Sequence, residues 1–203
     1  MSGYIFYIQN FVELFTNKSF KGWGRKKTGN FAKFCYEKFG GELTLKEDGF
    51  IRSLDLGIND SSSFSRVEDN IGIYYDATVP SKLENILNSY NFSSDTKLMV
   101  DARKAIKIIL ESNISKYNSS SLEVPKEFLK DELRVLVIAQ TQGDASLQYG
   151  MLDNYTTEDM IEAAIDENPN ATVYLKVHPD VLSGKKYSDI KIEDIQNRCI
   201  VIK

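Results

Sequence analysis

Two strand-like runs on either side of one helix constrain the fold of this chain most strongly. The first, "RVLVIA" at 134–139, is continuously apolar, as is typical of a strand buried on both faces of a parallel sheet. Residues 157–167 predict a helix, with Thr156 or Thr157 as its N-cap and acidic residues in its first turn. "TVYLKV" at 172–177 predicts the next strand. Strand, helix and strand in this order predict a βαβ unit and an α/β fold.

The first half of the chain also mixes helical and strand-like patterns. Residues 41–45 and 71–77 predict two strands, and the polar run 59–70 between them is interpreted as a loop. Residues 29–41 predict a helix with apolar residues on one face. These residues are Phe31, Phe34, Cys35 and Phe39.

Two further helices are predicted before the middle of the chain. Pro80 and Ser81 open the first, and Glu84 follows Ser81 at the spacing of a capping box. Residues 96–111 form the second, which is amphipathic. Its apolar residues include Leu98, Met99, Ala102, Ile106 and Ile109.

The segment 112–127 is rich in serine and asparagine and contains Pro125, so it is the best linker candidate. We therefore expect one α/β lobe over residues 1–125 and the start of a second over residues 126–203.

Composition limits the classes of function. The chain has 203 residues, of which 42% are hydrophobic and 27% charged, as in a folded globular protein. Its net charge of −4 gives no basic field for nucleic acid. It has neither a run of apolar residues that would span a membrane nor a signal-peptide pattern at its start. Cys35 and Cys199 fit no redox or metal spacing, so we expect buried thiols in a reducing, cytoplasmic compartment. With one histidine, zinc is not expected.

Asp144 follows the 134–139 strand in a connection far longer than a usual strand-to-helix loop. Ligands of α/β proteins bind outside the carboxyl ends of the strands, where this loop lies. Asp144 is therefore either a catalytic carboxylate or part of a Gly-Asp turn, and the pattern alone leaves both open.

His178, the single histidine, stands where the 172–177 strand ends, followed by Pro179. Strand alternation points Lys176 and His178 to the same side, where they could bind an anion or serve acid–base chemistry. The alternative is a histidine that only caps the next segment.

Two charged segments in the first half are further candidates. "EDGFIRS" at 47–53 contains Glu47, Asp48 and Arg52, which form either a surface ion pair in a turn or part of a cleft shared with Asp144. "GWGRKKTGN" at 22–30 has glycines at phosphate-loop spacing but lacks the following Lys-Ser/Thr, which excludes that motif. Arg25 and its neighbouring lysines either contact an anion or form a solvated basic turn.

Several stretches together resemble one family: "GWGRKKTG", "EDGFIRSLDLG", "NIGIYYDATVPSKLE", "VLVIAQTQGDASLQYG", "AAIDENPNATVYLKVHPDVLSGKK" and "NRCIVI". Their order and spacing are similar to those of the capsular-polysaccharide β-Kdo transferases of Gram-negative bacteria. The resemblance runs from about Gly22 to the end of the chain.

The resemblance implies a GT-B-like glycosyltransferase with two Rossmann-like lobes, an acceptor-side lobe followed by a donor-side lobe. It implies transfer of β-Kdo from CMP-Kdo, with retention, to a lipid-linked Kdo acceptor. No cofactor is implied. Capsule assembly and export proteins and a peripheral contact with the inner membrane are the other expected partners. Further Rossmann elements are implied after "RCIVI", so we expect the second lobe and its CMP site to be incomplete in this chain.

By the same resemblance, Asp144 is the nucleophile, Glu47 an acid–base or acceptor-orienting group, and His178 a contact of the donor carboxylate or phosphate. A second set of residues is expected to bind substrate: Arg25, Asp48, Arg52, Gln140, Ser146, Lys176 and Pro179. A rival hypothesis is a non-catalytic interaction or scaffold module in capsule assembly and export.

Overall fold

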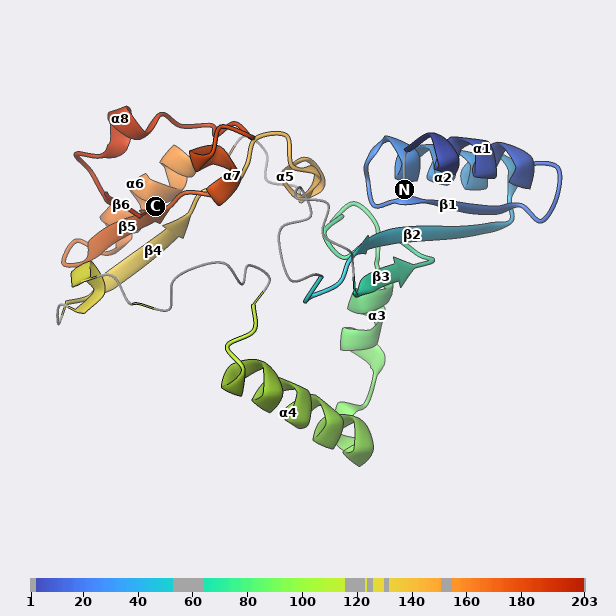
Figure 1. Cartoon of the computed structure of the whole chain (residues 1–203), viewed down its shortest axis with the longest axis horizontal. Helices are drawn as coiled ribbons and strands as arrows, with labels where there is room; N and C mark the ends of the chain where they lie inside the picture. Colours follow the sequence, from blue (N-terminus) through green and yellow to red (C-terminus); the bar gives the residue numbers. More distant parts are fainter. Residues whose placement is uncertain are drawn as a thin grey trace. The chain divides into compact units, whose positions relative to one another are not determined.

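The computed structural model of the chain describes residues 3–52, 64–115, 123, 126–129, 132–150 and 155–202. The chain forms two compact units, Met1–Ser121 and Leu122–Lys203, each with its own three-stranded sheet and helices (Figure 1). It is an α/β protein. Among the described helices, none is long and apolar enough to cross a bilayer.

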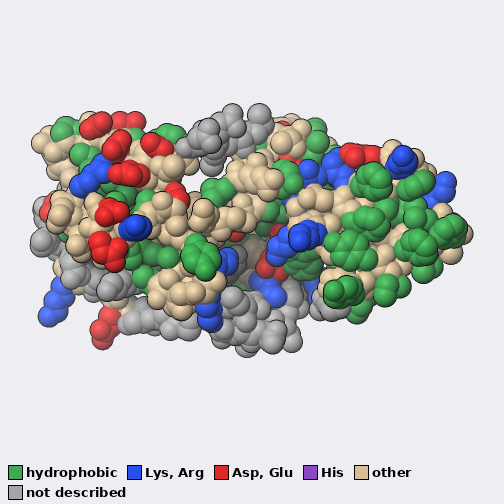
Figure 2. Space-filling view, turned by 90° about the horizontal axis from the view of Figure 1, so that it is seen from above, with side chains coloured by type: hydrophobic (Ala, Val, Ile, Leu, Met, Phe, Trp, Pro, Cys, Tyr) green, Lys and Arg blue, Asp and Glu red, His purple; other side chains and the backbone are tan. Residues whose placement is uncertain are grey.

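The sheet of the first unit has the order β1-β2-β3. Strand β1 (Ser19–Trp23) pairs in parallel with β2 (Glu42–Asp48), and β2 pairs antiparallel with β3 (Arg66–Asp69). Helix α2 (Lys27–Phe39) is the crossover between the parallel strands, and α1 (Gly3–Glu13) lies beside it on the same side of the sheet (Figure 1). Their outer surface carries many hydrophobic side chains (Figure 2).

Only part of the predicted apolar face of α2 is buried. Cys35 packs in the core as expected, but Phe34 and Phe39 are exposed. The helix instead turns small residues to the sheet. Gly29 lies so close to the end of β1 that an added Cβ would stand 2.7 Å from the carbonyl oxygen of Trp23 and 1.9 Å from that of Gly24, the next residue. Close packing of helix on strand therefore selects glycine and alanine, not the bulky residues, for this face. The core consists of Phe20, Ala32, Cys35, Leu43, Leu45 and Ile73.

The predicted strand at 71–77 is wrong, and the predicted loop before it is wrong in part. The strand lies earlier, at Arg66–Asp69, while residues 59–63 of the predicted loop lie outside the described residues. The buried Asp69 carboxylate accepts backbone N–H groups from Ile71, Gly72 and Lys82. These bonds fold the chain back in turns and take up donors that a strand would give to its neighbour.

Helices α3 (Lys82–Ser89) and α4 (Thr96–Glu111) confirm the two helices predicted here. Ser81 caps α3 by accepting the N–H of Glu84 at 3.1 Å. Asp95, after the short 3-10 helix η2 (Phe92–Ser94), caps α4 by accepting the N–H of Leu98 at 2.9 Å. No residue of α4 is buried.

The second unit confirms the predicted βαβ unit. Strand β4 (Arg134–Ile138) pairs in parallel with β5 (Thr172–Lys176), which pairs in parallel with β6 (Ile200–Ile202). Helix α6 (Thr157–Glu167) connects β4 to β5 and begins with a capping box between Thr156 and Asp159. Shorter helices are η3 (Lys126–Leu129), α5 (Ala145–Tyr149), α7 (Pro179–Leu182) and α8 (Ile192–Ile195).

Strand β4 is buried on one face only, which corrects the prediction that it is buried on both, whereas β5 also buries Tyr174 on its opposite face. Val137 and Ala139 are buried on the side of α6, whereas Leu136 and Ile138 are 54% and 55% exposed. The core comprises Val137, Ala139, Ile161, Ala164, Val173, Leu175, Val177, Ile195 and Cys199. Cys199, like Cys35, is a buried free thiol whose pKa is raised by that burial.

Candidate active site

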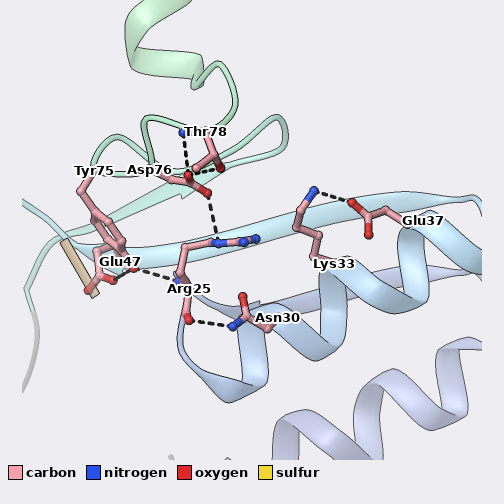
Figure 3. A network of polar contacts seen from close by, with 8 residues as sticks. All are labelled: Arg25, Asn30, Lys33, Glu37, Glu47, Tyr75, Asp76 and Thr78. Carbon is pink, nitrogen blue, oxygen red and sulfur yellow. Dashed lines mark hydrogen bonds and ion pairs between the residues drawn. The ribbon is translucent and has the colours of Figure 1, made fainter. Parts of the chain in front are cut away.

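Glu47 stands near the end of β2 and is held by aromatic donors. Its carboxylate accepts the indole N–H of Trp23 at 2.9 Å and the hydroxyl of Tyr75 at 3.4 Å. Trp23 ends β1, the strand next to β2, so the sheet brings it alongside Glu47. Two donors on one carboxylate fix its orientation (Figure 3, which draws the Tyr75 contact).

Tyr75 connects Glu47 to the loop after β1. Its hydroxyl oxygen accepts the backbone N–H of Arg25 at 2.8 Å while the hydroxyl donates to Glu47. Burial raises the pKa of Tyr75 to about 12, and the neighbouring Glu47 carboxylate acts in the same direction. Tyr75 is therefore a protonated donor at physiological pH.

The guanidinium of Arg25 is not a freely solvated basic group, because it is paired within the chain; contact with a bound anion stays a prediction. Its Nε lies 3.1 Å from a carboxylate oxygen of the buried Asp76, an ion pair without hydrogen-bond alignment. The other Asp76 oxygen accepts the N–H of Thr78 at 3.0 Å. Arg25 is thus placed rigidly beside the Tyr75–Glu47 pair (Figure 3).

Gly24 makes this arrangement possible. Its φ is +41°, and an added Cβ would lie 2.2 Å from the Tyr75 hydroxyl and 2.6 Å from a Glu47 carboxylate oxygen. Only glycine combines this backbone conformation with such a close approach.

Asp48 and Arg52 form an ion pair, with Arg52 Nε 2.7 Å from Asp48 Oδ1. The ion pair expected in the "EDGFIRS" segment is present, with both side chains partly buried. A cleft shared with Asp144 stays a prediction.

Asp144 begins the helix α5. Its Oδ1 accepts both the backbone N–H and the hydroxyl of Ser146, each at 2.9 Å, and the residue is exposed to solvent. The turn-forming alternative is therefore part of the structure. The turn does not exclude a catalytic role for Asp144, because the Ser146 N–H and hydroxyl hold its exposed carboxylate in one orientation.

His178 caps α7. Its Nδ1 accepts the N–H of Asp180 at 3.1 Å, so a neutral ring carries its proton on Nε2. Pro179 is the first residue of α7. Asp180 is buried, with its carboxylate 3.8 Å from the Lys186 ammonium and 3.9 Å from His178 Nδ1.

The loops carrying Asp144 and His178 leave the carboxyl ends of neighbouring parallel strands. The N–H of Ala139 donates to the carbonyl of Lys176 at 3.0 Å, and that of Gln142 to the carbonyl of Tyr187 at 3.0 Å. Gln140 lies between them, exposed, with its amide donating to the carbonyl of Ile138. Asp144 and His178 thus share one edge of one sheet.

Glu47, in contrast, belongs to the first unit, so its convergence with Asp144 and His178 in one cleft stays a prediction. Sequence reasoning missed Trp23, Tyr75, Asp76 and Asp180 as parts of these clusters. A signal for Asp180 was present in its position two residues after His178. In the described part of the chain no cluster of three or more His, Cys, Asp or Glu side chains could hold a metal ion.

A family model described as "Capsule polysaccharide biosynthesis protein" matches residues 21–202, nearly the whole chain. This chain belongs to that family. It is 42% identical over 169 residues to the capsule polysaccharide modification protein LipA of Neisseria meningitidis serogroup A, covering 81% of this chain and 24% of LipA. It is 34% identical over 190 residues to the lipopolysaccharide-processing protein LpsZ of Rhizobium meliloti, covering 93% of this chain and 43% of LpsZ.

Two solved structures are similar over most of the chain. Thermosulfurimonas dismutans KpsC, beta Kdo 2,4 transferase, is 39% identical with a TM-score of 0.78, over 90% of this chain and 56% of that one. Thermosulfurimonas dismutans KpsC, beta Kdo 2,7 transferase, is 27% identical with a TM-score of 0.67, over 100% of this chain and 58% of that one. The chain therefore spans from about a quarter to somewhat over half of the length of these four relatives. It is a KpsC-like member of the capsule family.

Proposed function

We propose that this chain is the part of a retaining β-Kdo transferase that carries its nucleophile, and that it acts in synthesis of the capsule linker. The observation that carries the proposal is the 39% identity and TM-score of 0.78 with a β-Kdo 2,4 transferase over 90% of the chain. Similarity to the 2,7 transferase is lower on both measures, which favours a 2,4 linkage. The two units would correspond to the two lobes of a GT-B enzyme.

In the first step, the Asp144 carboxylate attacks the anomeric carbon of Kdo in CMP-Kdo. A carboxylate–Kdo ester forms as the carbon–oxygen bond to the phosphate breaks, and CMP leaves with the electron pair. Fixed hydrogen bonds from Ser146 support this role, because they aim the carboxylate without neutralising it.

In the second step, a hydroxyl of the glycolipid acceptor attacks the same carbon. Its proton passes to a general base and Asp144 leaves as a free carboxylate. Two inversions give net retention. Glu47 is the proposed base, since Trp23 and Tyr75 hold its carboxylate in place.

Neutralising the negative charge of the leaving CMP matters more than protonating it, because a phosphate monoester is already a good leaving group. His178 supports that role with Nε2–H as a donor, and Lys176 two residues earlier supplies a positive charge on the same side. Arg25, Asp48, Arg52, Gln140, Ser146 and Pro179 stay proposed substrate contacts.

The test is incubation of the chain with CMP-Kdo and a glycolipid ending in Kdo, with products read by mass spectrometry and linkage analysis. The proposal predicts one added Kdo in a β-2,4 linkage. Binding of capsule assembly proteins with no CMP release would instead favour the scaffold hypothesis.

A further inference from the structure

The outer side of α1 is unusually apolar. Tyr4, Ile8, Phe11 and Phe15 recur at helical spacing in and just after this helix, and they are 80%, 65%, 60% and 77% exposed. The outer side of a surface helix normally carries polar residues. A helix that is apolar on both its inner and its outer side is expected to contact a second apolar surface with its outer side.

A buried polar contact fixes which side of α1 faces outward. Asn10 is 1% exposed and clamps the backbone of Lys21 twice, because its amide donates to the Lys21 carbonyl and its carbonyl accepts the Lys21 N–H, both at 2.8 Å. Tyr7, also on the inner side, packs on Phe31 of α2 with ring centroids 5.2 Å apart. Rotating the exposed stripe inward would break both contacts, so its exposure is built into the packing.

Helix α2 extends this surface and adds positive charge. Lys27, Phe34 and Lys38 lie on its outer side, spaced seven and four residues apart, and all three are exposed. Figure 2 shows hydrophobic side chains gathered over this end of the molecule, with Lys and Arg side chains around them. We call the surface formed by Tyr4, Ile8, Phe11, Phe15, Lys27, Phe34 and Lys38 the α1–α2 face.

The surroundings of the α1–α2 face are strongly basic in an acidic chain. Residues 3–41 contain seven lysines and arginines but only two acids, a net charge of +5, while the whole chain carries −4. Both acids are engaged: Glu37 pairs with Lys33, and Glu13 accepts the N–H of Ser19 at 3.3 Å. Lys27 and Lys38 place part of this positive charge on the face that carries the exposed aromatic side chains.

We infer that the α1–α2 face docks on a bilayer surface containing anionic phospholipid. Exposed phenylalanine and tyrosine side chains on a helix lying parallel to the bilayer enter the boundary between headgroups and acyl chains. Lysines at the edge of such a face meet the lipid phosphates. A second copy of the chain is a poorer occupant, because Lys27 and Lys38 of one face would meet those of the other and repel them. The inference is independent of the proposed transferase activity.

Vesicle co-sedimentation of the whole chain tests this docking. We expect binding to vesicles of mixed phosphatidylcholine and phosphatidylglycerol and weaker binding to vesicles of phosphatidylcholine alone. The difference in binding between the two kinds of vesicle should shrink as the salt concentration is raised. A double variant, Phe11→Ser with Phe15→Ser, should reduce partition to the mixed vesicles about tenfold or more by removing two aromatic side chains. Lys27→Gln with Lys38→Gln should reduce the preference for anionic vesicles on the order of tenfold.

The chain offers a matched control on α4. Ile106 and Leu110 are also separated by one helical turn and are 56% and 69% exposed, but they lie outside the α1–α2 face. Ile106→Ser with Leu110→Ser should leave vesicle binding within about twofold of the original. Circular dichroism of each variant checks that the fold is kept.

Three results would overturn the inference. The original chain could fail to bind anionic vesicles, or the Phe11/Phe15 variant could bind as well as the control. The chain could also form dimers that this variant alone dissociates in light scattering, which would identify the face as a contact between copies.

Discussion

Arg25 and Asp76 form an ion pair in which the carboxylate side chain is 1% exposed, and its oxygen lies 3.1 Å from the guanidinium Nε. The pair joins the loop after β1 to the turns after β3, two segments far apart in the sequence. It also holds in place the backbone N–H that Arg25 donates to Tyr75, and so the position of Glu47.

Replacing Asp76 by alanine should therefore destabilise the first unit strongly. The change takes the Asp76 carboxylate away from a partly buried guanidinium and removes the acceptor of the Thr78 N–H. We expect the free energy of unfolding to fall by about 3 kcal/mol or more in urea titration. Asp101→Ala, which removes the exposed partner of Lys97 in α4, is the control and should change it by less than about 0.5 kcal/mol. Equal effects would show that the Arg25 pair is no more than a surface contact.

Gly24→Ala should displace the Glu47 side chain while Glu47 itself is left unmutated. The new methyl group would overlap the Tyr75 hydroxyl and the Glu47 carboxylate, so one of them must move. We expect a loss of about 2 kcal/mol or more in unfolding free energy, from overlap added to backbone strain. Gly40→Ala also has positive φ but nothing within 4 Å of its added Cβ, and should lose only about 1 kcal/mol. Similar losses for both variants would contradict the close approach at Gly24.

The first unit should lose stability as pH rises between about 10 and about 12. The pKa of Tyr75 is raised from 10.0 to about 12, so over this range the folded state holds a proton that the unfolded state has released. Stability is then constant below pH 10 as far as this group is concerned, and falls as pH rises toward the folded pKa. Tyr75→Phe should flatten this part of the curve, as measured by denaturation at a series of pH values. An unchanged slope would mean that Tyr75 titrates alike in both states.

Local signals predicted much of the second unit. Strands β4 and β5 are apolar runs, and the helix α6 between them has a helical hydrophobic period and a capping box. All of these signals lie within one short stretch of the chain. The parallel pairing of β4 and β5, and the placement of Asp144 and His178 at one edge of the sheet, follow from that order alone.

The first unit was harder to predict because its key determinants act over long distances. "IGIYYDA" has the composition of a strand, but the Asp69 carboxylate takes its N–H groups and folds it into turns. Helix α2 buries Gly29 because the helix packs closely against Gly24. The hydrophobic pattern of the helix gives no sign of this contact. The link from Asp76 through Arg25 and Tyr75 to Glu47 joins residues 28 to 51 positions apart, so a pattern search along the chain does not detect it.

Ser146 should matter for transfer more than for stability. Its hydroxyl is one of two groups that hold Asp144 Oδ1, and the backbone N–H would remain in Ser146→Ala. We expect the transfer rate to fall about tenfold, as for the loss of one hydrogen bond to a charged group, while the unfolding free energy changes by less than about 1 kcal/mol. The rate of CMP release under single-turnover conditions measures the effect. An unchanged rate would remove Ser146 from the site.

The identity of the nucleophile is the central claim, and Asp144→Asn tests it most directly. Asparagine is also a good N-cap, so α5 should persist and circular dichroism should not change. Its amide cannot attack as an anion, so the account predicts a loss of transfer on the order of 10³-fold or more. Mass spectrometry of the original chain, quenched during turnover with CMP-Kdo, should find one Kdo on the peptide containing Asp144, and none in the variant. Transfer by Asp144→Asn at nearly the original rate, with no adduct on that peptide in the original chain, would contradict it.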